Sequence, residues 1–503
     1  MLSVLQVILI LFVPILLAVG YVTGKHIPNV YYPTSPLLFK VCQRVEAPGS
    51  ASDDANDDAT HVNGNGSANG SLKKGVETMS IKTFLESKVP SLYKGYRLSW
   101  WLPNGHSQTC YAAVGDFTKT DQILYERTLL RTPDGGTLGL DMTPTTEENP
   151  DLPDDTPIVV VQHGLCGGSY ESYVRSVLAH ACASKSQGGL GYRGIVINFR
   201  GCANVPLTSW QFYSSGHTDD LRCGLLYISH KFPKAPLVGI GFSLGAGIIT
   251  RYLGEEKEKS RLQAAVALAC PWDCVKNSRR FETEFVPKTF YSPVLGGTLL
   301  ASFRIHVDSL RKLPPDDRLA PQLDNIMSLK KNPTLKEVDE AFIRFCGGHS
   351  PPFPFKSADD YYAWGSSHHH LSSIRVPFLA ISSADDPIIG IAPTKEAIHG
   401  QTTALVVTPA GGHLGWFQGG SPIGRPPDRW FRKPALQFLR AAAEDYVPDS
   451  RYGPPKDGSD RIERDGFVLE RGKDLVGFKV VSTGEIIHGG EGKPTHGLNM
   501  WGF

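Results

Sequence analysis

Short runs of consecutive apolar residues, many of them β-branched, recur along the middle of the chain. Such continuous runs are typical of strands covered on both faces, as in a parallel sheet. They predict strands at 157–163, 194–199, 236–242, 264–270, 376–382 and 403–409. The stretches between them are more polar and predict helices at 170–184, 219–230 and 246–256. This alternation indicates an α/β fold with a doubly wound, mostly parallel sheet.

A hairpin and a long insertion complete the predicted architecture. "TPDGGTLGLDM" at 132–142 predicts a hairpin leading into the sheet, with Asp134, Gly135 and Gly136 as its turn. More than 100 residues separate the predicted strands at 264–270 and 376–382, although one crossover needs far fewer. We interpret about 274–370 as a cap over the C-terminal edge of the sheet.

The main domain is thus predicted over 80–446. The tail at 447–503 begins with Pro- and Gly-rich turns, and its sequence indicates no role.

The N-terminus has a different composition. Residues 1–22 carry no charged side chain, and such a run is long enough to cross a bilayer as a helix. No basic residue precedes it, which favours an uncleaved anchor over a signal peptide. Lys25, Lys40 and Arg44 follow it, so the positive-inside tendency predicts a single-pass protein with a cytoplasmic catalytic domain, at the endoplasmic reticulum or a lipid-droplet surface. Residues 49–75 are rich in Gly, Ser, Asn and Asp and predict a disordered linker.

Charge and cysteine content exclude several classes of protein. The formal net charge of +1 argues against a nucleic-acid binder. The nine cysteines are dispersed and form no Cys-x-x-Cys, which argues against a disulfide framework or a zinc ribbon.

No cofactor or metal ion is expected from the motifs of the chain. "GGEGKPT" near the C-terminus lacks the first glycine of a phosphate-binding loop. "SSHHH" at 366–370 has no cysteine or spaced carboxylate beside it, and "SGHTDDL" at 215–221 is interpreted as the start of a helix.

One glycine-rich stretch carries candidate chemistry. Gly241-Phe242-Ser243-Leu244-Gly245 matches Gly-x-Ser-x-Gly between a predicted strand and a predicted helix. The pattern alone also fits an ordinary glycine-rich turn, but the strand–turn–helix context is the one that a nucleophilic serine requires. Ser243 is therefore the predicted nucleophile.

A serine hydroxyl needs a base, and in this type of fold the order is Ser, then Asp or Glu, then His. "SSADDPIIG" follows the strand at 376–382 and offers Asp385 and Asp386. We prefer Asp386, which lies directly before the Pro-apolar-apolar stretch, and keep Asp385 as the alternative. The next predicted strand is followed by "AGGHLGWF", which places His413 as the predicted base.

Two backbone N–H groups are predicted to form an oxyanion hole. The N–H of Leu244 lies at the start of the helix after Ser243. The second candidate is the N–H of Leu165, in the glycine-rich loop after the strand at 157–163. His163 precedes the serine by 80 residues and is interpreted as holding this loop by hydrogen bonds.

Seven motifs occur together and in a fixed order, and as a set they resemble a known family. They are "WWLPNGHSQT" (100–109), "TPDGGTLGLDM", "HGLCGGSYESYV", "NFRGC" (198–202), "GFSLGA", "SADDP" and "GGHLGW". The chain resembles the membrane-anchored α/β-hydrolase domain proteins related to embryogenesis-associated protein, which include fungal medium-chain fatty-acid ethyl ester synthase/esterases. The resemblance covers about 80–446. It implies an α/β-hydrolase fold, a Ser–Asp–His triad at Ser243, Asp386 and His413, an N-terminal anchor and lipid-like ester substrates.

The predicted function is that of a serine esterase or lipase acting on medium- or long-chain acyl esters through an acyl-enzyme. One alternative is an alcohol O-acyltransferase that makes fatty-acid ethyl esters from acyl-CoA and a short-chain alcohol. The other is a non-catalytic membrane scaffold, which would be expected to have lost Ser, His or the acid. The expected partners are a lipid or fatty-acyl ester and the bilayer.

Overall fold

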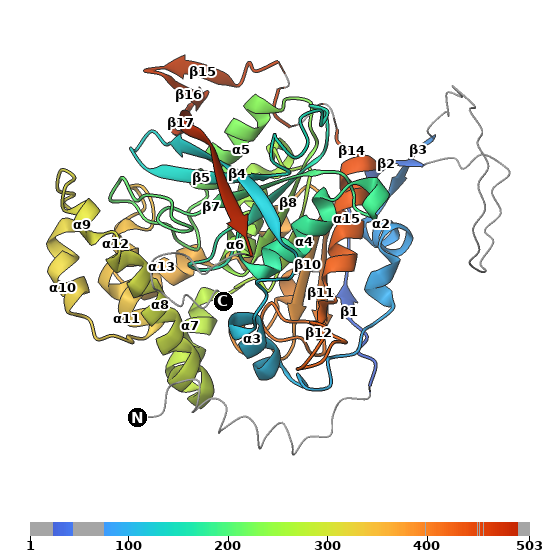
Figure 1. Cartoon of the computed structure of the whole chain (residues 1–503), viewed down its shortest axis with the longest axis horizontal. Helices are drawn as coiled ribbons and strands as arrows, with labels where there is room; N and C mark the ends of the chain where they lie inside the picture. Colours follow the sequence, from blue (N-terminus) through green and yellow to red (C-terminus); the bar gives the residue numbers. More distant parts are fainter. Residues whose placement is uncertain are drawn as a thin grey trace.

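The computed structural model describes residues 24–43 and 75–490, except positions 398, 450, 452 and 456. The described residues form a central twelve-stranded sheet in the order β1-β11-β10-β9-β8-β6-β7-β5-β4-β17-β16-β15 (Figure 1). Its parallel centre consists of β6 (Ile158–Gln162), β7 (Arg193–Asn198), β8 (Leu237–Phe242), β9 (Ala264–Leu268), β10 (Phe378–Ser383) and β11 (Thr403–Thr408). All six predicted strands are therefore confirmed.

Antiparallel strands flank this parallel centre. β4 (Ile123–Arg131) and β5 (Thr137–Thr143) form the predicted hairpin, and β5 pairs with β7. β1 (Asn29–Tyr31) pairs antiparallel with β11 at the opposite edge. A separate three-stranded sheet joins β2 (Phe39–Gln43), β3 (Gly75–Met79) and β14 (Tyr446–Val447), and β12 (Phe417–Gln418) pairs with β13 (Asp428–Arg429).

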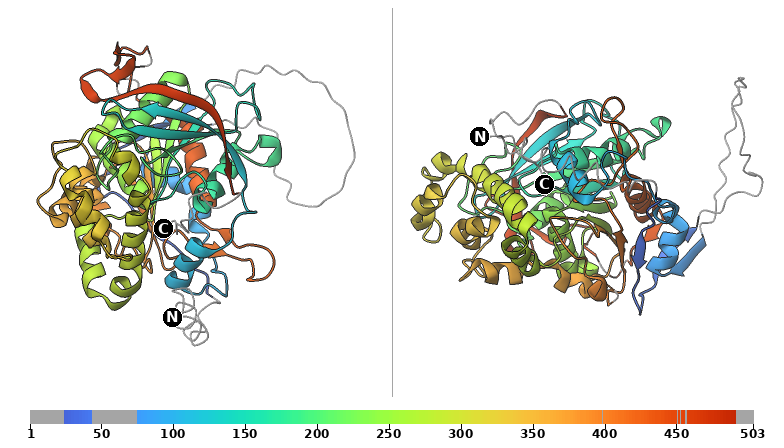
Figure 2. Two further views of the ribbon diagram at one scale, coloured as in Figure 1. Left: turned by 60° about the vertical axis from the view of Figure 1, so that its left-hand side comes forward. Right: turned by 90° about the horizontal axis from the view of Figure 1, so that it is seen from below.

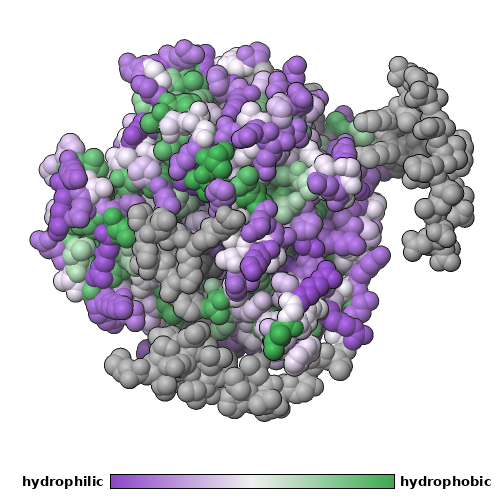
Figure 3. All heavy atoms as spheres, in the orientation of Figure 1, coloured by the Kyte–Doolittle hydropathy of each residue, from purple (hydrophilic) through white to green (hydrophobic). Residues whose placement is uncertain are grey.

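Helices cover both faces of the sheet, and successive strand residues point to opposite sides. In β6, Val160 belongs to one buried cluster and Val159 to the other. α5 (Asp219–Lys231) and α6 (Leu244–Glu256) pack on the first face, whereas α4 (Ser172–Cys182), α15 (Arg432–Glu444) and α2 (Ile81–Lys88) pack on the second. The surface shown in Figure 3 is mainly hydrophilic, with hydrophobic side chains in scattered groups. Burial of both strand faces explains why the strands read as continuous apolar runs.

The segment 274–370, predicted as a cap, is mostly helical and lies on the opposite side of the molecule from β2 and β3 (Figures 1 and 2). Its main helices are α7 (Cys274–Thr283), α8 (Ser292–Arg304), α9 (Val307–Leu310), α10 (Leu323–Ser328), α11 (Leu335–Val338), α12 (Arg344–Cys346) and α13 (Ala358–Gly365). Two π-helical turns, η4 (Pro287–Tyr291) and η6 (Asp339–Ile343), lie between these helices, and the 3-10 helix η7 (Ser367–Ser373) follows α13. Elsewhere α3 (Gly105–Val114) precedes β4, and α14 (Thr394–Ala397) lies between β10 and β11.

The predicted localisation requires correction. Among the residues that the structure describes, no helix is both long and apolar enough to cross a bilayer, which does not fit a single-pass membrane protein. The segments predicted as an anchor (1–22) and as most of a linker (49–75) lie outside the described residues, apart from Gly75 at the start of β3.

The tail contains a structure that its sequence did not indicate. β15 (Arg461–Arg464), β16 (Phe467–Glu470) and β17 (Lys473–Gly489) extend the central sheet beyond β4. β17 pairs antiparallel with β4 from Lys479, opposite Arg131, to Gly489, opposite Ile123. Without β17, β4 would be the edge of the sheet, and β17 therefore covers it.

Candidate active site

The register of the parallel strands brings four loops together at one edge of the sheet. Gln162 at the end of β6 is level with Gly241 near the end of β8, so the loops that carry Leu165 and Ser243 are adjacent. Ser383 at the end of β10 is level with Thr408 at the end of β11, so the loops after these strands also meet. Carboxyl ends of neighbouring parallel strands are where ligands bind in open α/β sheets.

Ser243 occupies a sharp turn between β8 and α6. Its backbone has φ of +51° and ψ of −119°, a conformation that non-glycine residues rarely adopt. The N–H of Ser243 donates to the carbonyl of Leu268 on β9, at 2.9 Å, which fixes the turn to the sheet. The side chain is largely buried, with 7% of the residue exposed.

The two glycines of the motif are required by close packing. A Cβ atom at Gly241 would lie 2.6 Å from the Cα of Ala246, and one at Gly245 would lie 2.3 Å from the carbonyl oxygen of Gln162. Both contacts are with backbone, which cannot move aside as a flexible side chain could. The motif is therefore a steric requirement of the turn that presents Ser243.

His413 lies against Ser243 although the two residues are 170 positions apart. Its Nε2 is 2.9 Å from the Oγ of Ser243, and its Nδ1 is 2.8 Å from the Oδ2 of Asp386. The carboxylate only accepts, so Nδ1–H donates to Asp386 and Nε2 is left to accept from the serine hydroxyl. The structure thus brings three of the predicted residues into one hydrogen-bonded chain.

Asp386, and not Asp385, contacts the histidine. The Oδ1 of Asp386 accepts the backbone N–H groups of Ile388 and Ile389, at 2.8 and 3.1 Å, which leaves Oδ2 directed at His413. Asp385 binds elsewhere: its Oδ1 accepts from the Oγ of Ser383 and from the N–H of Gly412. Burial raises the pKa of the Asp385 carboxyl. Asp385 therefore holds the loop in which His413 lies.

Helix α3 provides a further support that sequence reasoning did not identify. The Oγ1 of Thr109 accepts the N–H of His413 at 2.8 Å and donates to the carbonyl of Gly105 at 2.6 Å. A Cβ atom at Gly412 would lie 2.3 Å from that same carbonyl. Thr109 and Gly105 belong to the motif at 100–109, and Gly412 and His413 belong to "GGHLGW". The joint occurrence of these two motifs was the only indication in the sequence that the residues are in contact.

The two predicted oxyanion-hole groups are backbone donors without an acceptor among the described residues. On either side of Leu165, the N–H of Gly164 donates to the Oη of Tyr173 and the N–H of Cys166 to the Oη of Tyr213. After Leu244, the N–H of Gly245 donates to the carbonyl of His163 and that of Ala246 to the carbonyl of Ser243. The N–H groups of Leu165 and Leu244 make no such bond, and both leucines line the same cavity as Ser243.

His163 fixes the loop that carries Leu165. Its Nδ1–H donates to the carbonyl of Gly164 at 2.8 Å, and its Nε2 accepts the N–H of Phe199 at 3.1 Å. Burial lowers the pKa of His163 to about 4, so the ring is neutral near pH 7 and keeps both bonds.

A buried ion pair fixes the other end of the same loop. Arg127 and Asp141 form a bidentate pair at 2.6 and 2.7 Å, and the Oγ of Ser169 donates to Asp141 at 2.5 Å. The loop therefore has fixed partners on both sides of Leu165.

A cavity of about 480 Å³ extends from Ser243 beneath the helices of 274–370. This volume lies within the range of about 300–1,000 Å³ typical of small-molecule sites. Much of the wall is apolar, including Phe281, Leu295, Leu299, Leu335, Ile388 and Ile389.

The wall of the cavity also contains one buried carboxyl group. The Oδ2 of Asp339 accepts from the Oη of Tyr362 at 2.6 Å. Burial raises the pKa of Asp339 to about 7. This carboxyl group therefore titrates close to neutral pH.

Comparison with known families agrees with this geometry. A family model for the alpha/beta hydrolase fold matches residues 157–419, just over half of the chain. The chain belongs to the α/β-hydrolase family. The matched range begins one residue before β6 and includes Ser243, Asp386 and His413.

Several named proteins are similar to this α/β hydrolase over most of their length. The monoacylglycerol lipase of Saccharomyces cerevisiae is 31% identical over 399 residues, which cover 72% of this chain and 84% of the lipase. Embryogenesis-associated protein EMB8 of Picea glauca is 31% identical over a region that covers 72% of this chain and 76% of EMB8. Medium-chain fatty acid ethyl ester synthase/esterase 2 of S. cerevisiae is 27% identical over a region that covers 76% of this chain and 94% of that protein. These proteins match the family that the motifs of the sequence resembled.

Proposed function

We propose that the protein is a serine esterase or lipase that hydrolyses acyl esters at Ser243. The observation that carries this proposal is the hydrogen-bonded chain of Ser243, His413 and Asp386, which opens into a largely apolar cavity. A serine, a histidine and a carboxylate in this order are the groups that acyl transfer through a serine needs. The relatives named as lipase or esterase support a carboxylic ester hydrolase. Residues 80–446 would form the catalytic unit, with 274–370 as its cap.

In the proposed mechanism, Nε2 of His413 takes the proton of Ser243 as Oγ attacks the ester carbonyl. The N–H groups of Leu165 and Leu244 donate to the oxyanion, and each contributes about 3 kcal/mol to the stability of the transition state. The C–O bond to the alcohol then breaks, and the alcohol leaves with the proton held by His413. Water, deprotonated by His413, attacks the acyl-enzyme and releases the fatty acid.

Acyl transfer to a short-chain alcohol is the second candidate. The ethyl ester synthase/esterase covers 76% of this chain, and its name combines both reactions. In this reaction an alcohol replaces water as the second nucleophile, and an acyl-CoA would serve as the acyl donor. The same residues would act, so only the product separates transfer from hydrolysis.

Labelling and turnover test the proposal directly. We expect a fluorophosphonate to label the wild-type protein and p-nitrophenyl esters to be hydrolysed, and both to be lost in Ser243→Ala. Adding ethanol and measuring ethyl ester separates transferase from hydrolase. Equal labelling of the variant would refute Ser243 as the nucleophile, and a folded wild type that turns over no ester would refute the esterase.

The chain-length profile tests the role of the cavity. Each methylene that the cavity buries should raise kcat/KM about fourfold, because its burial contributes about 0.8 kcal/mol. Leu335→Trp places a larger side chain in the cavity wall and should move the preferred ester to shorter chains. Leu329→Trp is the matched control, since Leu329 lines a neighbouring surface groove and not the cavity itself. If both variants keep the wild-type profile, the acyl chain does not bind beside Leu335.

A further inference from the structure

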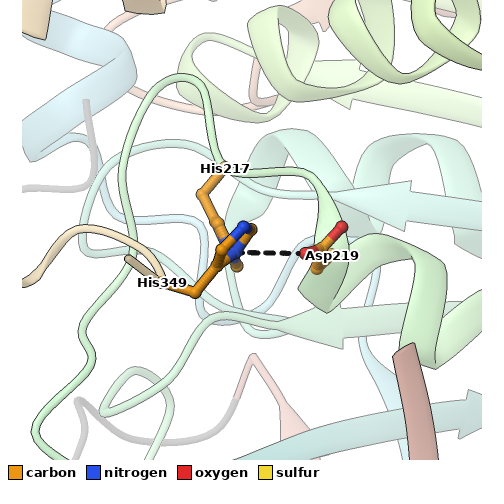
Figure 4. Close-up of side chains that lie close together, drawn as sticks. All are labelled: His217, Asp219 and His349. Atoms are coloured by element: carbon orange, nitrogen blue, oxygen red, sulfur yellow. Dashed lines mark hydrogen bonds and ion pairs between the residues drawn. The ribbon is translucent and has the colours of Figure 1, made fainter. Parts of the chain in front are cut away.

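Three side chains outside the candidate active site converge on one point. They are His217, from the loop before α5, Asp219, the first residue of α5, and His349, from the loop between α12 and α13 (Figure 4). His217 is buried, and the other two side chains are partly exposed. Within the described part of the chain, these three residues are the one set of three or more His, Cys, Asp or Glu side chains whose donor atoms lie close enough together to hold a metal ion.

The distances between the three donor atoms match those around a tetrahedral ion. The Nε2 of His217 is 3.0 Å from the Nδ1 of His349 and 3.7 Å from the Oδ2 of Asp219. The Nδ1 of His349 is 3.3 Å from that same oxygen. A tetrahedral Zn²⁺ with bonds of about 2.0–2.1 Å holds its ligand atoms about 3.3 Å apart. The three measured edges bracket this value.

Hydrogen bonding alone accounts for only one edge of this triangle. One imidazole N–H can donate to the other ring nitrogen at 3.0 Å, but no hydrogen bond among the described residues joins the Nδ1 of His349 to the Asp219 oxygen, 3.3 Å away. That oxygen is too far from His217, at 3.7 Å, for a hydrogen bond. A cation between the three atoms would satisfy all of them at once.

The surrounding structure holds each ligand in place. The Oδ1 of Asp219 accepts from Arg222 at 2.9 Å, which directs Oδ2 toward the rings. Arg200, the other cation near His217, is held by Asp134 and Asp220.

The loop that carries His349 approaches closely because of a glycine. A Cβ atom at Gly348 would lie 2.8 Å from the Cδ2 of His217, so a side chain at this position would push the two loops apart. His349 also lines a surface groove, through which an ion and a water ligand can reach the site.

We propose that His217, Asp219 and His349 bind a divalent transition metal, Zn²⁺ in the first instance, with water as the fourth ligand. Two imidazoles and one carboxylate are a donor set that zinc accepts, with one position left open. The ion would tie the loop at 347–355 to the start of α5 and so fasten the cap to the core. The loop before α5 also carries Ser214 and Ser215, which line the cavity, so the ion would stabilise one of its walls.

Metal content of the purified full-length protein tests the proposal. We expect about one Zn²⁺ per chain after dialysis against a weak chelator, and at least a tenfold loss of bound zinc in His349→Ala. His369→Ala is the matched control, because His369 is exposed in the "SSHHH" run and lies outside the triangle. This variant should retain zinc like the wild type.

Two further readouts separate a built site from adventitious binding. Co²⁺ in place of Zn²⁺ should give the intense visible absorption of a four-coordinate ion, and Asp219→Asn should remove it. Zn²⁺ should raise the Tm of the wild type and of His369→Ala by several degrees but leave His349→Ala unchanged. Equal zinc retention in His349→Ala and the wild type, or none in either, would mean that His217 and His349 form a hydrogen-bonded pair only. If His349→Ala does not fold, Asp219→Asn decides the same question.

Discussion

The Oδ2 of Asp386 lies 2.8 Å from the Nδ1 of His413, whereas the neighbouring Asp385 binds the N–H of Gly412, the residue before that histidine. Two adjacent carboxylates thus contact one loop in different ways. Asp386 orients the imidazole ring, and Asp385 orients the backbone that carries it. Removing the charge of Asp386 and removing that of Asp385 should therefore have different effects on kcat.

Asp386→Asn should lower kcat by about 10⁴-fold with little change in Tm. An amide that points its NH₂ group at Nδ1 stabilises the wrong tautomer of His413, so Nε2 can no longer accept the proton of Ser243. Asp385→Asn is the matched control and should keep kcat within about tenfold, since an amide oxygen can still accept from Gly412. Steady-state kinetics with a p-nitrophenyl ester measures both, and a larger loss in Asp385→Asn would reverse the assignment of the acid.

Gly245→Ala should destabilise the protein and abolish labelling of Ser243. The added methyl group would meet the carbonyl of Gln162 at 2.3 Å, and overpacking of this kind costs about 1–3 kcal/mol. Gly247→Ala, two residues later on α6, is the control: its methyl group would have its nearest neighbour at 3.7 Å. It should be neutral or stabilise the helix by up to about 1 kcal/mol.

Urea unfolding and the rate of fluorophosphonate labelling compare the two glycine variants. Equal stability and equal labelling rates would show that the turn at Ser243 relaxes to accept a side chain. The proposed rigid presentation of the serine would then be wrong.

The sequence predicted the parallel sheet because burial on both faces leaves a local signal, the continuous apolar run. It also predicted the positions of Ser243 and His413, since each follows such a run in a glycine-rich loop. It could not decide between Asp385 and Asp386, because both follow β10 and only the backbone path after the strand directs one of them at His413.

Contacts between distant segments left no local signal. His217 and His349 are 132 residues apart, and no ligand spacing links them in the sequence. The strand β17 was missed for a related reason. Much of it is exposed and its apolar residues do not form a continuous run, so only its pairing with β4 reveals it.

The stability of the protein should depend on the ionisation of Asp339. Its pKa is about 7 in the folded protein and near 3.8 as a free side chain, so between these values the folded state binds the proton more strongly. The free energy of unfolding therefore falls as the pH rises from about 4 to 7, by an amount on the order of 3–4 kcal/mol from this group. Asp339→Asn cannot ionise and should lack this contribution.

Urea unfolding at pH 5 and pH 8 measures the effect of Asp339. The difference in stability between Asp339→Asn and the wild type should grow in favour of the variant at the higher pH. Asp324→Asn, at an exposed position on α10, should follow the wild type at both pH values. Parallel pH dependences for all three proteins would mean that Asp339 ionises normally despite its burial.

The tail should be needed for a stable sheet. A chain that ends at Asp449 lacks β15, β16 and β17, so the backbone N–H and C=O groups of β4 that pair with β17 would lie unpaired at an open edge, while β5 still pairs with the other side of β4. It also removes the buried Phe478, whose ring lies 5.3 Å from that of Tyr227 on α5. We expect a Tm lower by several degrees and association through the open edge.

A chain that ends at Gly490 is the control for this truncation, since it keeps all three strands. It should match the full-length protein in Tm and in its size by light scattering. If the chain ending at Asp449 is equally stable and equally monodisperse, β4 does not need its partner. The pairing with β17 would then contribute nothing measurable to the stability of the fold.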